Sequence, residues 1–313
     1  MWSSKRFSLE EIGVEGTYTI PQIPSIDLRC LSRYSPKQKY LFTNKGQERC
    51  LLHMESQLDH GSYGNVYKAK RNETYVLLKQ PRMTEMNLLQ EAVLQHLAYK
   101  TLEVEHLGWA IPKVYDVFWN GKEVWFSMEW IHGYSISDWF GSLQAPDVET
   151  LYFIAQLCLI LATLETHLNL DHRDLKISNL LIKKEPCTIH VKLQDTTWTL
   201  YSPFTVVVLD FGFACLGSEL LRGKPWVNLG DGVLPPMDPC PKEGRDMFHL
   251  LTSLLGQPIV QQRLSKRLHD RIDGWLSVGK KSYGPMARRW STENWSYLVS
   301  SQSNFSIPNC CPL

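Results

Sequence analysis

The sequence lacks an excess of charge of either sign, since 33 lysine and arginine residues balance 32 acidic residues for a formal net charge of +1. A protein that binds nucleic acid through a broad basic surface normally carries a clear basic excess. We therefore expect no direct nucleic-acid partner. The 313 residues are 43% apolar and 21% charged, which is typical of a globular chain with a sizeable core and excludes collagen, coiled coil and wholesale disorder.

The sequence also lacks paired cysteine motifs and a long apolar run. None of the eight cysteines forms a CxxC pair, and no Cys/His grouping has the spacing of a zinc site. Residues 1–10 are polar and do not resemble a secretory signal, so reduced thiols are expected. The most apolar run, Leu151–Leu164, is interrupted by Gln156 and is shorter than the roughly 20 residues of a bilayer span. It predicts a buried helix and no membrane span.

The first half of the chain divides into an irregular part and a β-rich part. Residues 1–49 are rich in turn formers without a sustained hydrophobic period, which predicts an N-terminal extension. Residues 50–131 predict a small β-rich lobe of five strands with one amphipathic helix, Thr84–Tyr99, and a hairpin turn at Asn120-Gly121. The expected strands are Cys50–Leu58, Asn65–Lys70, Thr74–Lys79, Lys113–Trp119 and Val124–Trp130.

Residues 132–313 predict a second, mainly helical lobe. A long buried helix is expected at Asp147–Leu168 and another helix at Met247–Leu255. Two short strands are expected at Leu180–Ile182 and Phe204–Leu209. Between them, an insert at about residues 183–203 begins and ends with turn-like sequence, which predicts an extended hairpin.

Three residues of the β-rich lobe could contact phosphate groups. Gly61 and Gly64 lie between two expected strands, where the lack of a Cβ atom allows a hairpin backbone to approach a polyanion closely. The next expected strand ends in Lys79. This lysine can be an ordinary edge residue with its charge in solvent, or a point charge held against the phosphates of a nucleotide.

The helix after Lys79 contains two glutamates, Glu85 and Glu91. Glu91 lies near the apolar stripe of the helix, and a carboxylate that half faces the interior needs a cationic partner. Lys79 is the nearest cation on the preceding strand. Only five residues separate Lys79 from Glu85, too few to leave the strand and align a helix, so we favour Glu91 as the partner.

The segment from His172 to Asn179 brings together residues suited to phosphoryl transfer. Asp174 can accept a proton from an attacking hydroxyl, and Lys176 can neutralise charge on the transferring group. Asn179 offers an amide oxygen of the kind that Mg²⁺ prefers. Asp210, which follows another apolar strand, supplies a second oxygen ligand for the metal.

These motifs, in this order, resemble the eukaryotic-type protein kinase superfamily over about residues 50–255: a glycine-rich hairpin, a strand lysine, a helix glutamate, HRDLKxxN and DFG. The resemblance implies an α+β, two-lobed fold with a small β-rich N-lobe (50–131) and a mainly helical, shortened C-lobe (132–313). It also implies that ATP and Mg²⁺ bind in the cleft between the lobes. Lys176, in the HRDLK form, is similar to the serine/threonine kinases.

The resemblance assigns roles to individual residues. It implies catalytic roles for Asp174, Lys176 and Lys79, and metal ligation by Asn179 and Asp210. Met128 resembles the gatekeeper residue, and Glu129-Trp130-Ile131 the hinge whose backbone holds adenine. Asp246 resembles the acid that buttresses the catalytic loop. The implied ATP-binding residues are Asp59, His60, Gly61, Ser62, Tyr63, Gly64, Val66, Lys79, Glu91, Met128, Glu129 and Ile131.

The sequence departs from the family pattern in several places. Asp59 replaces the first glycine of GxGxxG, which adds negative charge near the phosphates. The interval between Lys79 and Glu91 is short, the interval between Asn179 and Asp210 is long, and no Ala-Pro-Glu motif follows DFG. These features are similar to divergent kinases, such as haspin-like, casein-kinase-one-like or viral kinases.

The sequence therefore predicts an ATP-dependent serine/threonine protein kinase, a monomer whose partner is a protein substrate that carries a serine or threonine. Its expected location is intracellular, in the cytoplasm or nucleus, or in the host cell or virion if the source is a virus. One alternative is a pseudokinase scaffold that binds partners without catalysis, which Asp59 and the missing Ala-Pro-Glu motif favour. Another is a small-molecule phosphotransferase of related fold, against which Lys176 argues.

Overall fold

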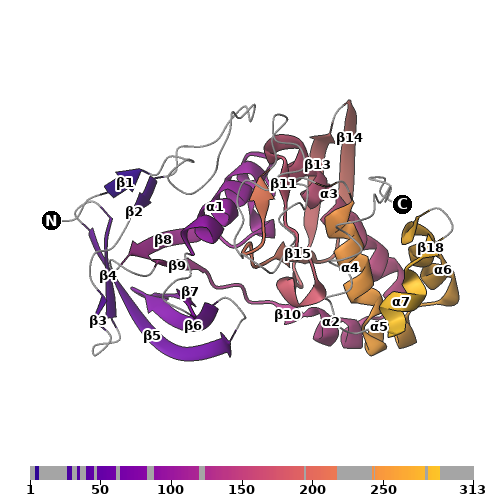
Figure 1. Ribbon diagram of the computed structural model, residues 1–313, viewed down its shortest axis with the longest axis horizontal. Coiled ribbons are helices and arrows are strands. Elements are labelled where there is room, and N and C mark those ends of the chain that lie inside the picture. Colours follow the sequence, from indigo (N-terminus) through magenta and orange to yellow (C-terminus); the bar gives the residue numbers. More distant parts are fainter. Residues whose placement is uncertain are drawn as a thin grey trace. The chain divides into compact units, whose positions relative to one another are not determined.

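The structure is a computed structural model of the 313-residue chain, and its described residues form two compact units (Figure 1). It describes residues 4–6, 27–29, 34–35, 40–45, 48–60, 64–82, 88–119, 124–193, 195–216, 242, 244–278 and 281–289. The first unit contains strands β1–β9 and helix α1 as far as Lys100. The second contains Thr101–Ile111 and the described residues from His132 onward.

The first unit is built on an antiparallel sheet of seven strands in the order β3-β4-β5-β6-β7-β9-β8. These strands are β3 (Tyr34–Ser35), β4 (Tyr40–Lys45), β5 (Glu48–His60), β6 (Gly64–Arg71), β7 (Thr74–Pro81), β8 (Val114–Trp119) and β9 (Val124–Glu129). A separate pair joins β1 (Ser4–Arg6) to β2 (Asp27–Arg29). Alternate residues of the sheet form a buried cluster of Leu52, Ala69, Val76, Leu78 and Trp125.

The five strands expected between residues 50 and 131 are confirmed, but the irregular extension up to residue 49 is wrong for its last part. Residues 40–45 form β4, which pairs with β5 over six positions from Tyr40↔His53 to Lys45↔Glu48. The two strands pair antiparallel across a two-residue connection, and backbone hydrogen bonds hold them together. A search for a hydrophobic period in the sequence does not detect such a pairing. The expected turn at Asn120-Gly121 lies outside the described residues.

Helix α1 (Leu89–Val104) ends later than the sequence predicts. Its buried face includes Val93, Leu94 and Leu97, as expected, and continues to Leu102. Residues 84–87, where the helix was expected to begin, are not among those the structure describes. The last turn was missed because Lys100, Glu103 and Val104 interrupt the apolar pattern around a single buried leucine.

The core of the second unit is α3 (Pro146–Leu168), which confirms the expected long buried helix. It ends at Asn169, whose left-handed backbone (φ 50°) and N–H bond to the Glu165 carbonyl cap the last turn. By length and composition α3 could span a membrane, and 56% of its most apolar window is buried within the protein. An aromatic cluster fixes its position, because the ring centroid of Trp139 lies 5.6 Å from that of Phe153 and 4.8 Å from that of Phe204.

The second unit also contains short strands, of which β11, β13, β14 and β15 contact α3. One sheet has the order β10-β12-β15, and two-stranded pairs are formed by β11 with β16, β13 with β14, and β17 with β18. The bounds are β10 (Tyr134–Ser135), β11 (Leu170–Asp171), β12 (Leu180–Lys183), β13 (Cys187–Leu193), β14 (Thr196–Ser202), β15 (Thr205–Val208), β16 (Cys215–Leu216), β17 (Ser277–Val278) and β18 (Lys281–Ser282). The pair β13–β14 confirms the extended hairpin predicted for residues 183–203.

The second unit contains further helices, one of which the sequence predicts. They are η2 (Gly108–Ala110), α2 (Ile136–Ser142), η3 (Ile177–Asn179), α4 (Arg245–Leu255), α5 (Pro258–Arg263), α6 (Lys266–Trp275) and α7 (Gly284–Arg289). The expected helix Met247–Leu255 is confirmed as α4. Ser265 caps α6, with its side chain accepting a hydrogen bond from the Leu268 N–H.

The cysteines differ in part from the expectation of reduced thiols. Cys158 and Cys187 carry thiols, whereas Cys215 is disulfide-bonded. A disulfide requires two Cα atoms within about 4.4–6.8 Å of each other, a condition set by the fold and not by spacing along the chain.

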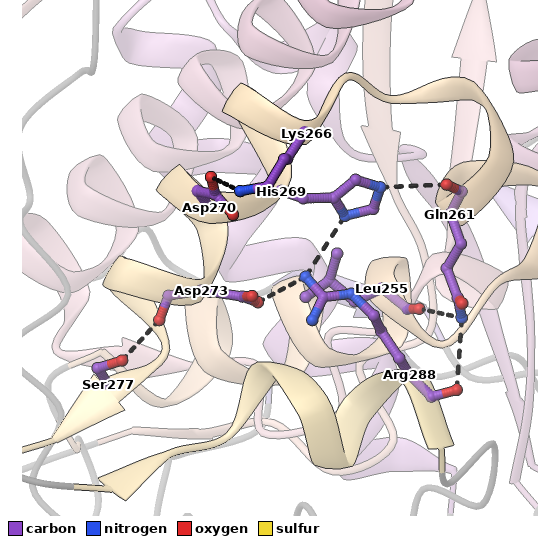
Figure 2. A network of polar contacts seen from close by, with 8 residues as sticks. All are labelled: Leu255, Gln261, Lys266, His269, Asp270, Asp273, Ser277 and Arg288. Atoms are coloured by element: carbon purple, nitrogen blue, oxygen red, sulfur yellow. Dashed lines mark hydrogen bonds and ion pairs between the residues drawn. The ribbon is translucent and has the colours of Figure 1, made fainter.

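A network of polar contacts joins the last three helices (Figure 2). His269 of α6 lies between α5 and α7. The Nε2 atom of His269 is 3.1 Å from the Gln261 carbonyl oxygen of α5, and its Nδ1 atom is 3.4 Å from Arg288 Nη2 of α7. Arg288 also donates to Asp273 Oδ1 at 2.7 Å. Gly284 must lack a side chain here, because a Cβ atom would lie 1.9 Å from Asp273 Oδ1.

We expect Gly284→Ala to destabilise the protein by about 1–3 kcal/mol, since the new methyl group displaces Asp273 from Arg288. The matched control is Gly274→Ala in α6, where a Cβ atom meets nothing within 4 Å, and which should stabilise by about 0.5–1 kcal/mol. Urea unfolding followed by circular dichroism measures both. Equal stability of the two variants would contradict the predicted clash.

Candidate active site

The first unit holds a buried ion pair between strand β7 and helix α1. Lys79 Nζ lies 2.5 Å from Glu91 Oε1, and the two residues are only 6% and 1% exposed. The predicted pair is therefore confirmed for Glu91. Glu85, the alternative, lies outside the described residues. Separation of the two side chains would leave each charge buried without its partner, which is strongly unfavourable. The pair therefore fixes the position of the Lys79 ammonium group.

The end of the glycine-rich hairpin lies against Lys79. Val66 is paired with Lys79 in the sheet, and Gly64 with Pro81. A Cβ atom on residue 64 would lie 2.8 Å from the Gln80 carbonyl oxygen and 3.2 Å from two carbons of the Lys79 side chain. Glycine is therefore required at position 64 by close packing. Asp59 and His60 lie in β5, and residues 61–63 fall in a gap of the described chain.

The predicted gatekeeper and hinge residues lie at the end of β9. Met128 is buried, and its sulfur accepts a hydrogen bond from Gln95 Nε2 at 3.4 Å. The Glu129 N–H donates to the Lys113 carbonyl at 2.9 Å, so this backbone donor already serves the sheet. Ile131, two residues further, is partly buried.

The second unit brings two of the predicted catalytic residues, Asp174 and Lys176, together with the predicted metal ligand Asn179. Asn179 Nδ2 donates to the Asp174 backbone carbonyl at 2.9 Å and to Asp174 Oδ2 at 3.1 Å. Lys176 Nζ lies 3.3 Å from the same carboxylate oxygen. Asp174 and Asn179 are buried, whereas the Lys176 side chain is 26% exposed. A carboxylate held by two donors on one oxygen has a fixed orientation, as a positioned proton acceptor requires.

Asp210 lies next to this group through the backbone. The Leu209 N–H donates to the Asn179 carbonyl at 2.8 Å, which places residue 210 beside Asn179. Asp210 has a left-handed backbone (φ 61°), and its Oδ1 accepts the Gly212 N–H at 3.3 Å. The Asn179 amide nitrogen points to Asp174, so its oxygen faces another direction.

This donor set fits a magnesium ion. An amide oxygen and a carboxylate are hard ligands, and Mg²⁺ commonly takes only one or two protein carboxylates besides water and substrate phosphates. Among the residues the structure describes, no cluster of three or more His, Cys, Asp or Glu could hold a metal by protein ligands alone. Asn179 and Asp210 would therefore hold the ion together with non-protein ligands.

A buried aspartate of helix α4 fixes the backbone before Asp174. Asp246 accepts the His172 N–H on Oδ2 and the Arg173 N–H on Oδ1, both at 2.7 Å. These bonds hold Arg173 in a left-handed conformation (φ 64°), which costs about 1–3 kcal/mol for a residue with a side chain. The buttressing contact that the sequence predicts for Asp246 is confirmed.

The ring of His172 links the catalytic loop to the segment after Asp210. Its Nε2 lies 2.9 Å from the Leu209 carbonyl, and its centroid is 5.0 Å from that of Phe211. Burial lowers the pKa of His172, and the ring is therefore neutral with its proton on Nε2, donated to that carbonyl.

Burial also dominates the electrostatics of the residues around the loop. It raises the pKa of Asp171 to about 7 and that of Asp246 to about 6, with the Arg245 guanidinium opposing both shifts. His249 of α4 shifts in the opposite direction. Burial, followed by the positive charges of Arg245 and its neighbours, lowers the pKa of His249 to about 3.

The pair formed by Asp171 and Arg245 was not predicted from the sequence. Asp171 directly precedes the segment from His172 to Asn179, and Arg245 directly precedes Asp246. Arg245 Nη1 lies 3.6 Å from Asp171 Oδ2, and that oxygen also accepts the Lys242 N–H at 2.8 Å. The available signal was a charged residue, Asp171, between the apolar Leu170 and the catalytic motif. A charge at such a position requires a buried partner.

The predicted site residues thus fall into two groups. Lys79, Glu91, Gly64, Val66, Met128, Glu129 and Ile131 belong to the first unit, and Asp174, Lys176, Asn179 and Asp210 to the second. Direct contacts join Lys79 to Glu91, and Asp174 to both Lys176 and Asn179. The assignment of ATP to these residues stays a prediction.

Comparison with known proteins finds similarity to protein kinases. Residues 52–219, more than half of the chain, match the family described as Protein kinase domain. A curated relative, the serine/threonine-protein kinase ppk35 of Schizosaccharomyces pombe, is 27% identical over 177 residues, which cover 51% of this chain and 27% of that protein. The chain therefore spans about a quarter of that relative.

Solved kinase domains are also similar at low sequence identity. The BubR1 kinase domain gives a TM-score of 0.41 at 14% identity, with 60% of this chain and 53% of that chain covered. The kinase domain of PF14_0431 gives a TM-score of 0.35 at 18% identity, with 54% and 52% covered.

The low pKa of His249 predicts a pH dependence of stability. In the unfolded chain this histidine takes up a proton near pH 6.5, but in the folded protein only near pH 3. Below pH 6.5 the unfolded chain takes up a proton at this histidine and the folded protein does not. The free energy of unfolding therefore decreases as the pH falls, by up to about 1.4 kcal/mol per pH unit. His249→Gln should lose less stability than the unmodified protein between pH 7 and 5 in urea unfolding. Parallel stability curves for the two proteins would contradict this.

Proposed function

Because the chain belongs to the protein kinase domain family and has its α+β fold, we propose that it is an ATP-dependent serine/threonine protein kinase. The observation that carries the proposal is the arrangement around Asp174, where Asn179 and Lys176 both contact one carboxylate oxygen. Phosphoryl transfer needs mainly positioning and charge neutralisation, and these three side chains supply both.

Each residue has a defined part in the proposed reaction. The substrate hydroxyl oxygen attacks the γ-phosphorus of ATP, its proton passes to Asp174, and ADP leaves. Lys176 neutralises charge on the transferring group. Lys79, held by Glu91, contacts the α- and β-phosphates. Asn179 and Asp210 would hold Mg²⁺, which supplies charge neutralisation at the phosphates when bound.

The serine/threonine class rests on Lys176, which lies within reach of the proposed proton acceptor. The curated relative is itself described as a serine/threonine-protein kinase, which supports the same class. The proposed partner is accordingly a protein that carries an accessible serine or threonine.

A scaffold that binds partners without catalysis is the second candidate. It is favoured by Asp59, which replaces the first glycine of GxGxxG and so adds negative charge to the motif that would cover the phosphates. Like charges in this position weaken nucleotide binding. Transfer of labelled phosphate to a peptide library distinguishes the two candidates, whereas nucleotide binding alone does not.

We expect Asp174→Asn to reduce phosphate transfer by about 10²–10⁴-fold, because the proton acceptor is lost. Lys79→Met should abolish turnover, because it removes the charge that contacts the phosphates. Asp270→Asn, which breaks an exposed ion pair with Lys266, is the control and should keep full activity. Labelled ATP with a peptide array measures transfer, and circular dichroism checks folding. Equal transfer by Asp174→Asn and the unmodified protein would refute the assignment.

A further inference from the structure

A second buried contact joins the catalytic loop to helix α4, beside the bonds of Asp246. Asp171 and Arg245 are 5% and 1% exposed and lie 3.6 Å apart. The Lys242 N–H donates to the same oxygen of Asp171 at 2.8 Å. The carboxylate is thus bound by both a side-chain cation and a backbone donor.

The two contacts interlock consecutive residues of the two segments. Asp171 of the loop binds Arg245, while the next two loop residues bind Asp246, which follows Arg245. In the β11–β16 ladder, Asp171 is also paired with Cys215, which lies three residues after Gly212. Asp171 therefore connects α4, the catalytic loop and the segment that follows Asp210.

Such a pair is poorly explained by stability alone. Two buried charges cost desolvation energy that their attraction only partly returns, and apolar residues of similar volume often stabilise as well or better. A buried ion pair does have direction and a defined length, so it fixes a register that apolar contacts leave looser. At this position the register is that of the backbone leading to Asp174.

The surroundings of Asp171 make its charge variable. A cavity of about 30 Å³, enough for one or two water molecules, lies beside it and is also lined by Cys158, Glu165, Lys242 and Arg245. Burial and the neighbouring Asp246 together raise the pKa of Asp171 to about 7, against the opposing effects of Arg245, the Lys242 N–H and Arg173. The groups that face it or line the same cavity are Glu165 of α3, Lys242, Arg245 and Asp246 at the start of α4, His172 and Arg173 of the loop, and Cys215 of β16.

We propose that Asp171 is a positioning residue of the kinase reaction, and that its ion pair with Arg245 aligns the backbone from His172 to Asp174 only while Asp171 is ionised. The proposal rests on the proposed function and extends it to control of turnover by pH. Protonation of Asp171 removes the charge that Arg245 attracts, so the loop loses one of its connections to α4, while the bonds of Asp246 and the bond from the Ile177 N–H to Ser253 remain. Asp174 then keeps its neighbours but loses its alignment.

The proposal predicts a separation of kinetic constants. Asp171→Asn should lower kcat by about 10-fold with the KM for ATP changed less than about 2-fold, because it affects alignment in the transition state and not nucleotide binding. The unmodified protein should lose kcat as the pH falls from about 8 to 6, and the variant should lack this step. Asp171→Glu, which keeps the charge, should restore part of kcat and the step itself.

The double variant Asp171→Leu with Arg245→Met separates positioning from stability. It should fold with a melting temperature at or above that of the unmodified protein, since apolar residues replace a buried ion pair. Its kcat should stay low and show no step near pH 7. Full kcat in this variant would overturn the proposal, because the ion pair would then be only a packing element.

Hydrogen–deuterium exchange of the peptide spanning residues 170–180 tests the proposal without any catalysis. The two proteins are compared with each other at one pH at a time. At pH 8 this peptide should exchange faster in Asp171→Asn than in the unmodified protein. At pH 6 the exchange rates of the two proteins should be similar. The control is Asp273→Asn, which breaks the ion pair with Arg288 and should leave this peptide unchanged.

Failure of the proposal and failure of the proposed function give different results. If the unmodified protein transfers no phosphate at any pH, the kinase function fails, while the exchange data still decide whether the ion pair holds the loop. If Asp171→Asn does not fold, the unmodified protein alone decides. Its exchange in residues 170–180 is then measured at pH 8 and at pH 6, each time relative to the rest of the second unit, and the proposal predicts faster relative exchange at pH 6. Unchanged relative exchange would overturn the proposal.

Discussion

The two hydrogen bonds from consecutive backbone N–H groups to the carboxylate of Asp246 are the interaction on which the second unit's site depends. They hold Arg173 in a backbone conformation that it would not adopt alone, and the chain direction they impose brings Asp174 to Asn179 and Lys176. Because Asp246 lies in the first turn of α4, the rigid helix sets the geometry of a loop that has little regular structure of its own. The chemistry of the loop is thus determined by a residue that contacts none of the reacting groups.

Much of this architecture could be predicted from local sequence patterns. A short β-rich run located the strand that contains Val76 and Leu78, and turn-like ends located the hairpin of β13 and β14. The partner of Lys79 could be chosen because Glu91 lies near the apolar stripe of the helix and because few residues separate Lys79 from Glu85. Asp174 and Asn179 were chosen by residue type and order, and the structure places them in contact, whereas their part in phosphoryl transfer stays a prediction.

Of the features that were missed, the β4–β5 hairpin and the last turn of α1 are local, whereas the buried polar contacts join distant segments. The pairing of β4 with β5 lies in the part expected to be an irregular extension. Asp171 and Arg245 are separated by 74 positions, the same interval as His172 and Asp246, so no window of sequence contains both. Gln156, read only as an interruption of an apolar run, donates to Ser202 and Phe204 and accepts from Val206. A buried polar side chain in an apolar helix was the signal for such a contact, but its partners could not be named.

The contacts of Gln156 have a consequence for how the chain tolerates change in length. They fasten the base of the β13–β14 hairpin to α3, and they fix the first residues of β15 independently of the hairpin's far end. The two strands are paired up to Leu193 and Thr196, where the chain turns around. Additional residues inserted at that turn would project outward without altering the alignment of β15 with β12. The turn is accordingly a suitable place for a fluorescent label or an affinity tag.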